Sequence, residues 1–387
     1  MDIKYLKGIC LVLTVVIVAV SGKAFYDHRH FQEEVVLGPG ITTVKRLSDY
    51  FGPLAGSTAD ANIYILDSGR PGGTAMIIGR SHPEEPAGNL AAQVIVENAV
   101  PTAGRLVVVI SANRSSSTVT RPGEGYPMYY EIPTDWGKKT FRMGCRWANP
   151  LDSWPDPEVY VHYPSGQMLA YMDIRNQNRT WPGRPDGLLM EQVNYAYCQV
   201  IEQEEVDLFI DLHEAELEYS VNNTIVAHER GRDIAVMASM FLTSDEFQLP
   251  LGMEYSPPAL RGLSHREVGD HTRAISLLIE VAEPMLDRIR GITDEKLLLE
   301  GNDPFVKRAG QLGLLYVGIP EEGWHIDRRV GRHLSTVLEI FNQWNFVNFD
   351  KPIEMDGVPR LADVLASGLG HYFHNPREFP EARIRYE

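Results

Sequence analysis

Apolar positions along the chain fall into short runs that alternate with longer segments of helical pattern. The short runs are rich in β-branched residues and predict strands, several of them buried on both faces, at residues 61–67, 74–79, 105–110, 206–213 and 274–280. The helical pattern covers residues 88–100, 187–204, 233–242, 286–312 and 331–344. Strands that alternate with helices predict an α/β fold, with a mixed, largely parallel sheet flanked by helices.

The same pattern suggests how the chain is divided. Residues 59–285 are expected to form the core, interrupted at 113–174 by a stretch rich in Pro, Gly, Trp and Tyr that reads as a long loop region. Residues 25–58 are polar and predict a linker or stalk. Residues 286–387 are expected to form a C-terminal helical extension.

The N-terminus departs most from the rest of the chain. Lys4 and Lys7 precede the apolar run 8–20, and small residues follow at 21–24, which is the arrangement of an export signal. Residues 1–24 are therefore predicted to be either a signal peptide, cleaved after Gly22 or Ala24, or a retained membrane anchor. The body is expected to lie outside the cytoplasm, in the periplasm, with membrane contact only through this segment.

Charge and cysteine content narrow the class of protein. The 387 residues include 36 Lys and Arg against 52 Asp and Glu, a formal charge of −16. Such a balance argues against a nucleic-acid-binding protein, because that binding depends on a basic face. Three cysteines are too few for a disulfide scaffold, although Cys145 and Cys198 could pair in an oxidising compartment.

Polar side chains that suit a metal follow three of the predicted strands. His82 and Glu85 are three residues apart at the start of a helix, and His213 ends another strand. Two histidines and one carboxylate form the ligand set of a catalytic zinc. Glu280 ends a third strand and is a carboxylate that could serve as general base for a metal-activated water. Each of these residues alone would more often be an ordinary surface or loop residue.

Taken together, these motifs resemble those of the zinc carboxypeptidase clan, and within it the succinylglutamate desuccinylase/aspartoacylase family. The resemblance spans about residues 60–285 and rests on four segments. They are Gly79-Arg-Ser-His-Pro-Glu-Glu-Pro-Ala-Gly88, Asn176-Gln-Asn-Arg-Thr-Trp-Pro-Gly183, Asp211-Leu-His213 and the strand that ends at Glu280.

The resemblance implies roles for individual residues. His82, Glu85 and His213 would bind one zinc ion per chain, and Glu280 would be the catalytic base. The resemblance also assigns the substrate carboxylate to two residues, Asn178 and Arg179, whose amide and guanidinium groups suit a carboxylate.

The sequence departs from the family pattern at several positions. Pro83 replaces the usual Gly, and Asn176 replaces an Asp. Glu84 lies beside Glu85, so either could be the ligand, although the spacing favours Glu85. The arginine that the family places before its Asn-Arg pair is missing at the expected spacing, which leaves Arg175 and Arg146 as candidates for stabilising an oxyanion.

Four further residues are candidates for supporting roles. Asp211 and Asp173 could accept the free N–H of a ligating histidine, and Asp211 could equally be a satisfied core residue. His265 and Arg266 precede the strand that carries Glu280 and could contact substrate, with an exposed polar loop as the equal alternative.

These inferences combine into one functional hypothesis with two rivals. The protein is expected to be an exported zinc-dependent hydrolase of amide bonds, of the deacylase or carboxypeptidase type, in which Glu280 takes the proton of a zinc-activated water. Its substrate would be a small acyl-amino acid or peptide with a free carboxylate. The rivals are a non-catalytic envelope binding or assembly protein on the same fold, motivated by Pro83 and Asn176, and a membrane-anchored structural protein.

Overall fold

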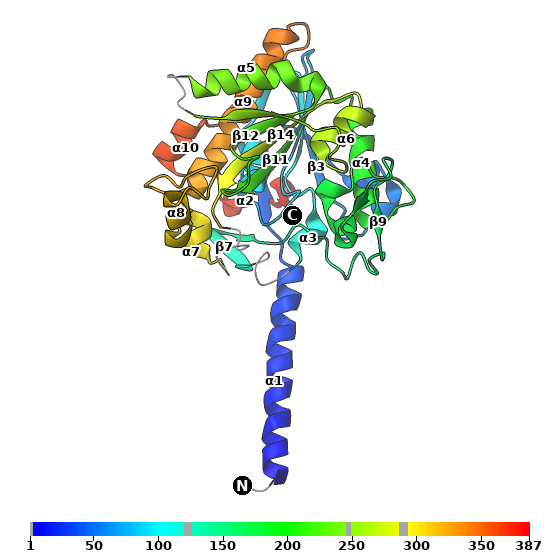
Figure 1. Ribbon diagram of the computed structural model, residues 1–387, viewed down its shortest axis with the longest axis vertical. Coiled ribbons are helices and arrows are strands. Elements are labelled where there is room, and N and C mark those ends of the chain that lie inside the picture. Colours follow the sequence, from blue (N-terminus) through cyan, green and yellow to red (C-terminus); the bar gives the residue numbers. More distant parts are fainter. Residues whose placement is uncertain (1–2, 120–125, 245–248, 286–292) are drawn as a thin grey trace.

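The body of the protein is built on an eight-stranded sheet (Figure 1). This computed structural model describes residues 3–119, 126–244, 249–285 and 293–387. In spatial order the strands are β13 (Gly252–Tyr255), β12 (Thr224–Ala227), β14 (Ile275–Glu283), β11 (Leu208–Glu216), β4 (Thr74–Ile78), β6 (Arg105–Val109), β3 (Asn62–Asp67) and β2 (Ile41–Arg46). The central strands β14, β11, β4 and β6 are parallel to one another. Strand β12 is parallel to β13, while the β12–β14, β3–β6 and β2–β3 pairs are antiparallel.

Helices cover both faces of the sheet, which is why the central strands are apolar on both sides. On one face α2 (Pro86–Asn98), α5 (Arg232–Thr243) and α9 (Ile326–Val347) share a core with alternate strand residues such as Ile77 and Ile210. On the other face α4 (Leu189–Gln203) and α6 (Ser264–His271) pack over Met76 and Phe209. The predicted α/β fold, with a mixed, largely parallel sheet flanked by helices, is confirmed.

The region 113–174, expected to be a long loop, contains short regular elements. They are α3 (Arg114–Ser117), the hairpin of β7 (Tyr129–Thr134) and β8 (Gly137–Arg142), the pair β9 (Tyr160–Val161) and β10 (Met168–Leu169), and the 3-10 turn η3 (Tyr171–Arg175). Between these elements the described residues have irregular backbone. Residues 120–125 lie outside the described residues.

The expected linker 25–58 is part of the folded body. It supplies β1 (Glu34–Val36), the edge strand β2 of the main sheet, and the 3-10 turns η1 (Leu47–Asp49) and η2 (Gly52–Leu54). Strand β1 pairs with β16 (Ile384–Tyr386), so the segment after the N-terminal helix lies against the end of the chain. Polar edge strands of this kind lack the apolar runs that reveal a buried strand.

The expected C-terminal extension forms a layer of the fold, because α9 packs on α2, α5 and β14. The other elements of this region are α7 (Glu295–Glu300), α8 (Pro304–Gln311), β15 (Glu354–Asp356), α10 (Leu361–Ser367), η6 (Leu369–Tyr372), η7 (Pro376–Glu378) and η8 (Glu381–Arg383). Strand β15 pairs with β5 (Val100–Ala103). The first part of the helix predicted over 286–312, residues 286–292, lies outside the described residues.

The N-terminal helix α1 (Ile3–Arg29) projects from the body (Figure 1). Among the described helices, it is the one that is long and apolar enough to cross a membrane. Its residues from Ile3 to Asp27 are exposed, whereas His28 is buried against the body. The structure therefore agrees with either a signal peptide or an anchor at this position.

Candidate metal centre

Three segments with polar side chains follow neighbouring strands of the sheet. Strand β4 ends at Ile78, and residues 79–85 lead from it into α2. Strand β11 pairs with β4 as far as Asp211 and carries His213 just beyond, while the register of β14 places Glu280 opposite His213. The carboxyl ends of parallel strands share one edge of a sheet, so the topology gathers these side chains there.

Local sequence explains the close approach of the first two ligand candidates. The backbone N–H of Glu85 donates to the carbonyl of His82 at 3.0 Å, which closes a turn with Pro83 at its second position. Proline is favoured there because its fixed φ matches the turn. Gly88 permits α2 to lie against β11, since a Cβ on it would be 2.5 Å from the carbonyl oxygen of Leu212. Pro83 is thus compatible with the site.

Three potential ligands converge in the buried space beyond these strands. His82 Nδ1 is 2.7 Å from Glu85 Oε1, and His213 Nδ1 is 2.9 Å from Glu85 Oε2. One ligand atom from each of the three residues lies within 4.8 Å of the others, and all three residues are buried. Two imidazole nitrogens and a carboxylate oxygen are the donors that zinc accepts in catalytic sites.

The contact of His82 Nε2 with Asn176 determines the tautomer of the His82 ring. His82 Nε2 is 2.9 Å from Asn176 Oδ1, and the backbone N–H of Asn178 donates to the same oxygen at 3.0 Å. That second bond identifies the amide oxygen as an acceptor, so His82 Nε2 carries the proton in a neutral ring. Its Nδ1 lone pair then points at the Glu85 carboxylate, an arrangement that a cation between them would satisfy.

A buried carboxylate lies behind the second histidine. Asp211 Oδ2 is 3.0 Å from His213 Nε2. The hydroxyls of Ser81 and Ser264 donate to Asp211 at 2.8 and 2.6 Å, which holds the carboxylate in place. Asp211 could have been a partner of a ligating histidine or a satisfied core residue. In the structure it contacts His213, one of the ligand candidates. The two serines had no sequence signal, because their role depends on an aspartate far away in the chain.

Electrostatics at the centre favour a positive charge between these groups. Burial opposes ionisation, yet Asp211 and Glu85 raise the pKa of His213 well above its ordinary value. Burial likewise opposes the charge on Glu85, but the charges of His82 and His213, when these rings are protonated, hold the pKa of its carboxyl well below the ordinary value. Metal ions compete with protons for such donors, so the ligand set fits a divalent cation such as zinc.

Glu280 lies next to this cluster with one oxygen unpaired. Its side chain is half-buried, and among the described residues no hydrogen-bond partner faces the buried atom Oε2. Burial raises the pKa of Glu280 well above its ordinary value, and the nearby carboxylate of Glu85 raises it further, against the opposing effect of His213. A carboxylate in this environment is suited to accept a proton.

The structure distinguishes the two adjacent glutamates. Glu84 Oε1 accepts a hydrogen bond from Arg146 Nε at 2.6 Å, whereas Glu85 lies between the two histidines. Arg146 Nη2 is 3.8 Å from Glu85 Oε1, which places its guanidinium at the edge of the cluster. Of the two arginines considered for an oxyanion, Arg146 is therefore the one beside the ligand candidates.

Arg175 is engaged elsewhere. Its Nε donates to Asp156 Oδ1 at 2.8 Å and its Nη1 donates to the carbonyl of Ala148 at 3.0 Å. Those contacts tie η3 to the preceding loop. Asp173, considered as a partner for a histidine, instead acts on Arg179: burial lowers the pKa of Arg179, and the charge of Asp173 opposes this in part.

Asn178 and Arg179 lie on the 3-10 turn η4 (Gln177–Arg179). Asn178 Oδ1 accepts from the backbone N–H of Ser264 at 2.8 Å, so the amide joins η4 to the start of α6. Arg179 is half-buried, and burial lowers the pKa of its guanidinium. Its Nη1 donates to the carbonyl of Asn178 at 2.7 Å, and Arg146 and Glu280 are among the charged groups that act on its pKa.

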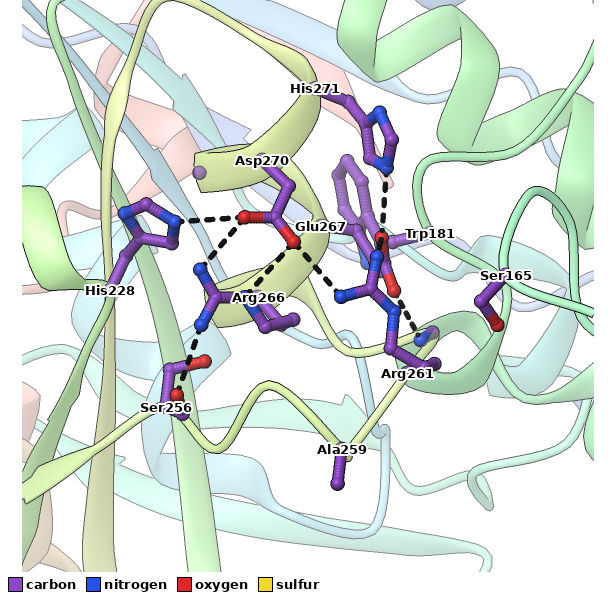
Figure 2. Close-up of polar contacts among 12 residues, drawn as sticks. Ser165, Trp181, His228, Ser256, Ala259, Arg261, Arg266, Glu267, Asp270 and His271 are labelled. Atoms are coloured by element: carbon purple, nitrogen blue, oxygen red, sulfur yellow. Dashed lines mark hydrogen bonds and ion pairs between the residues drawn. The ribbon is translucent and has the colours of Figure 1, made fainter. Parts of the chain in front are cut away.

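The two candidates on α6 are both held by neighbouring groups. Arg266 forms ion pairs with Glu229 and with Asp270 and donates to the carbonyl of Ser256 at 3.0 Å. Figure 2 shows its contacts with Asp270 and Ser256. His265 Nδ1 is 2.8 Å from the Ser256 hydroxyl, and burial lowers the pKa of its ring to about 3. These contacts fix α6 against the loop before it and give Arg266 a structural role.

The remaining expectation concerns the cysteines. Cys145 and Cys198, both within the described residues, are buried thiols and form no disulfide with each other.

Comparison with known proteins adds a fold likeness. No family model matches the sequence, and no curated protein matches it. Among solved structures, the chain is similar to a succinylglutamate desuccinylase from Silicibacter sp. TM1040, with 16% identity over 57% of this chain and 53% of that one and a TM-score of 0.34. An aspartoacylase family protein from Mesorhizobium loti matches with 19% identity over 58% and 56%, and a TM-score of 0.34.

A metallo-carboxypeptidase from Burkholderia cenocepacia matches with 12% identity over 84% of this chain and 68% of that one, with a TM-score of 0.44. The chain thus spans about half the length of the first two structures. Their names agree with the resemblance noted from the motifs. Because identity and TM-scores are low, the function proposed below rests on the geometry of the site.

Proposed function

We propose that the protein is a zinc-dependent hydrolase of amide bonds in substrates that carry a free carboxylate. One observation supports this most: His82, Glu85 and His213 converge in a buried cluster beside the unpaired carboxylate oxygen of Glu280. When bound to these ligands, zinc supplies a Lewis acid for a carbonyl oxygen and makes water acidic enough to activate near neutral pH.

The chain's own residues then have separate tasks in the proposed reaction. Asn176 and Asp211 hold the two histidine rings so that both Nδ1 atoms face Glu85. Glu280 accepts the proton of the attacking water and returns it to the leaving amine. Arg146, at the edge of the cluster, stabilises negative charge that develops on the carbonyl oxygen.

Arg179 is proposed to hold the substrate carboxylate. A guanidinium fork binds a carboxylate with two charge-assisted hydrogen bonds, and partial burial strengthens them. Asn178 positions the turn that carries Arg179, because its amide oxygen is tied to Ser264. The observation that motivated a non-catalytic protein, Asn176 in place of an Asp, is explained by the contact of Asn176 with His82.

The proposed location is the outer face of a membrane. Lys4 and Lys7 precede the apolar part of α1, and lysines of this kind stay on the cytoplasmic side. The body, which follows the helix, would then lie on the opposite side. The substrates proposed for that compartment are peptides and fragments of the cell envelope.

We expect the Arg179→Gln variant to lose activity on substrates with a free carboxylate but to keep most of its activity on the matching esters. Replacing a charge-assisted fork costs about 1.5–3 kcal/mol, which is roughly 10- to 150-fold in kcat/KM. The test uses zinc-loaded full-length protein in detergent, with N-acyl amino acids and peptides, each as the free acid and as the methyl ester. The loss should appear with the acids and be small with the esters.

Arg175→Gln provides the matched control: Arg175 is bound to Asp156, so this variant should keep the wild-type ratio of activity on acids and esters. An equal loss by Arg179→Gln on acids and esters would contradict the carboxylate-binding role. Turnover of none of the amides by the zinc-loaded protein would contradict the hydrolase itself.

A further inference from the structure

The length of α1 and the position of its aromatic residues match a membrane. Tyr5 lies near one end of the apolar segment, and Phe25 and Tyr26 lie at the other. Twenty-one residues separate Tyr5 from Tyr26, or about 31 Å of helix at 1.5 Å per residue. The hydrocarbon core of a bilayer is about 30 Å thick, and aromatic residues gather at its two interfaces.

The end of α1 is fixed to the body by several contacts. Arg142 Nη1 donates to the carbonyls of His28, Arg29 and Phe31 at 3.0, 3.3 and 3.1 Å. His28 is buried, with Nε2 3.2 Å from the carbonyl of Met143. These contacts fix the direction in which the helix leaves the body. A signal peptide that is cleaved off would not need such contacts.

The segment 149–155 exposes large apolar side chains beside this exit. Leu151 is 79% exposed and Trp154 is 73% exposed. Leu151 lines a pocket of about 430 Å³ together with Phe25 and Arg29 of α1, and Asp152 forms a 2.5 Å ion pair with Arg29. Exposed apolar side chains next to a membrane helix are well placed to enter the interface, and tryptophan prefers that region.

The residues just before this segment, Arg146 and Trp147, lie beside the candidate metal centre. Arg146 contacts Glu84, and the backbone of Trp147 forms a bridge with Asn176, whose side chain contacts His82. Residues 146–154 therefore connect the edge of the cluster to Trp154. In Figure 1 α3, which follows β6 at the site edge of the sheet, lies directly above the end of α1.

We propose that α1 is retained as a membrane anchor and that Leu151 and Trp154 enter the interface of the same bilayer. The body is thereby held on the membrane at two places, the helix α1 and the segment 149–155. The edge of the sheet that bears the metal centre then faces the lipid surface. This goes beyond the proposed function, since it concerns the pose of the protein and holds whether or not the centre hydrolyses amides.

The test uses the full-length chain in phosphatidylethanolamine/phosphatidylglycerol vesicles, with and without brominated acyl chains, which quench tryptophan at the membrane. We expect quenching of the wild type, its loss in Trp154→Phe, and its persistence in Trp136→Phe. Trp136 donates to the carbonyl of Phe373 in the body and is the matched control. Both substitutions are conservative, and zinc content and circular dichroism verify folding.

Three outcomes would overturn the proposal. A wild type that is not quenched, or a Trp154→Phe variant quenched as much as wild type, would show that this loop does not enter the bilayer. An intact mass of the membrane-extracted protein that lacks residues 1–24 would show that the helix is cleaved. Neither measurement depends on hydrolysis, so failure here and failure of the proposed function are distinguishable.

Discussion

The Glu280→Gln variant is expected to keep its zinc and to lose about 10²- to 10⁴-fold of its kcat, the usual contribution of a general base. Glutamine has the same shape as glutamate but cannot take a proton. The ligands His82, Glu85 and His213 are unchanged in this variant, so zinc content should match wild type. The measurement is kcat on the best amide substrate, together with zinc per chain.

Glu283→Gln is the matched control for this experiment. Glu283 lies on the same strand and is buried, but three residues along a strand its side chain points to the opposite face of the sheet. We expect its kcat to stay near the wild-type value. Retained turnover in Glu280→Gln would show that another group takes the proton.

The second large effect is expected on stability, from Glu33→Ala. Glu33 and Arg80 form an ion pair at 2.9 Å with both side chains 0% exposed, and Glu33 also accepts from the backbone N–H of Arg142 at 2.8 Å. Removing one member of a buried pair leaves the other charge without compensation, which costs about 3–5 kcal/mol. Denaturant unfolding followed by tryptophan fluorescence should show this loss in the free energy of unfolding.

Glu34→Ala, the substitution of the exposed neighbour, should leave the free energy of unfolding almost unchanged. Replacing both members of the pair, with Glu33→Leu and Arg80→Met together, should recover much of the stability, since neither charge then remains buried. If Glu33→Ala were as stable as Glu34→Ala, the buried Glu33–Arg80 pair would not stabilise the fold.

The fold could be predicted where each strand buries both of its faces. The runs at 74–79, 105–110, 206–213 and 274–280 correspond to the four central parallel strands, because burial on both sides leaves a continuous apolar sequence. Edge strand β2, with the sequence Ile-Thr-Thr-Val-Lys-Arg, has no such run, so the sequence alone predicts a linker there. Strand β2 is held by its pairing with β3, and the segment before it by the pair Glu33–Arg80, whose partners are 47 residues apart and show no local pattern.

The candidate site follows the same logic. His82, Glu85, His213 and Glu280 could be proposed from sequence because each comes at or just after a central strand, and the sheet brings these positions together. The contacts of Asn176, Ser81 and Ser264 could not be predicted from the sequence. A hydrogen bond to His82 or to Asp211 depends on the tertiary position of loops that are far apart in the chain. Likewise, the ion pair of Arg266 with Glu229, 37 residues away, has no local pattern in the sequence.

The most direct test of the central claim is the zinc content of the purified full-length protein. We expect one zinc ion per chain in the wild type, and a stoichiometry close to zero in His82→Ala and in His213→Ala, because three protein ligands are needed to hold a catalytic zinc. His371→Ala, which changes an exposed histidine, should keep its zinc. A wild type without stoichiometric zinc after zinc loading, or His82→Ala and His213→Ala variants that retain it, would contradict the account.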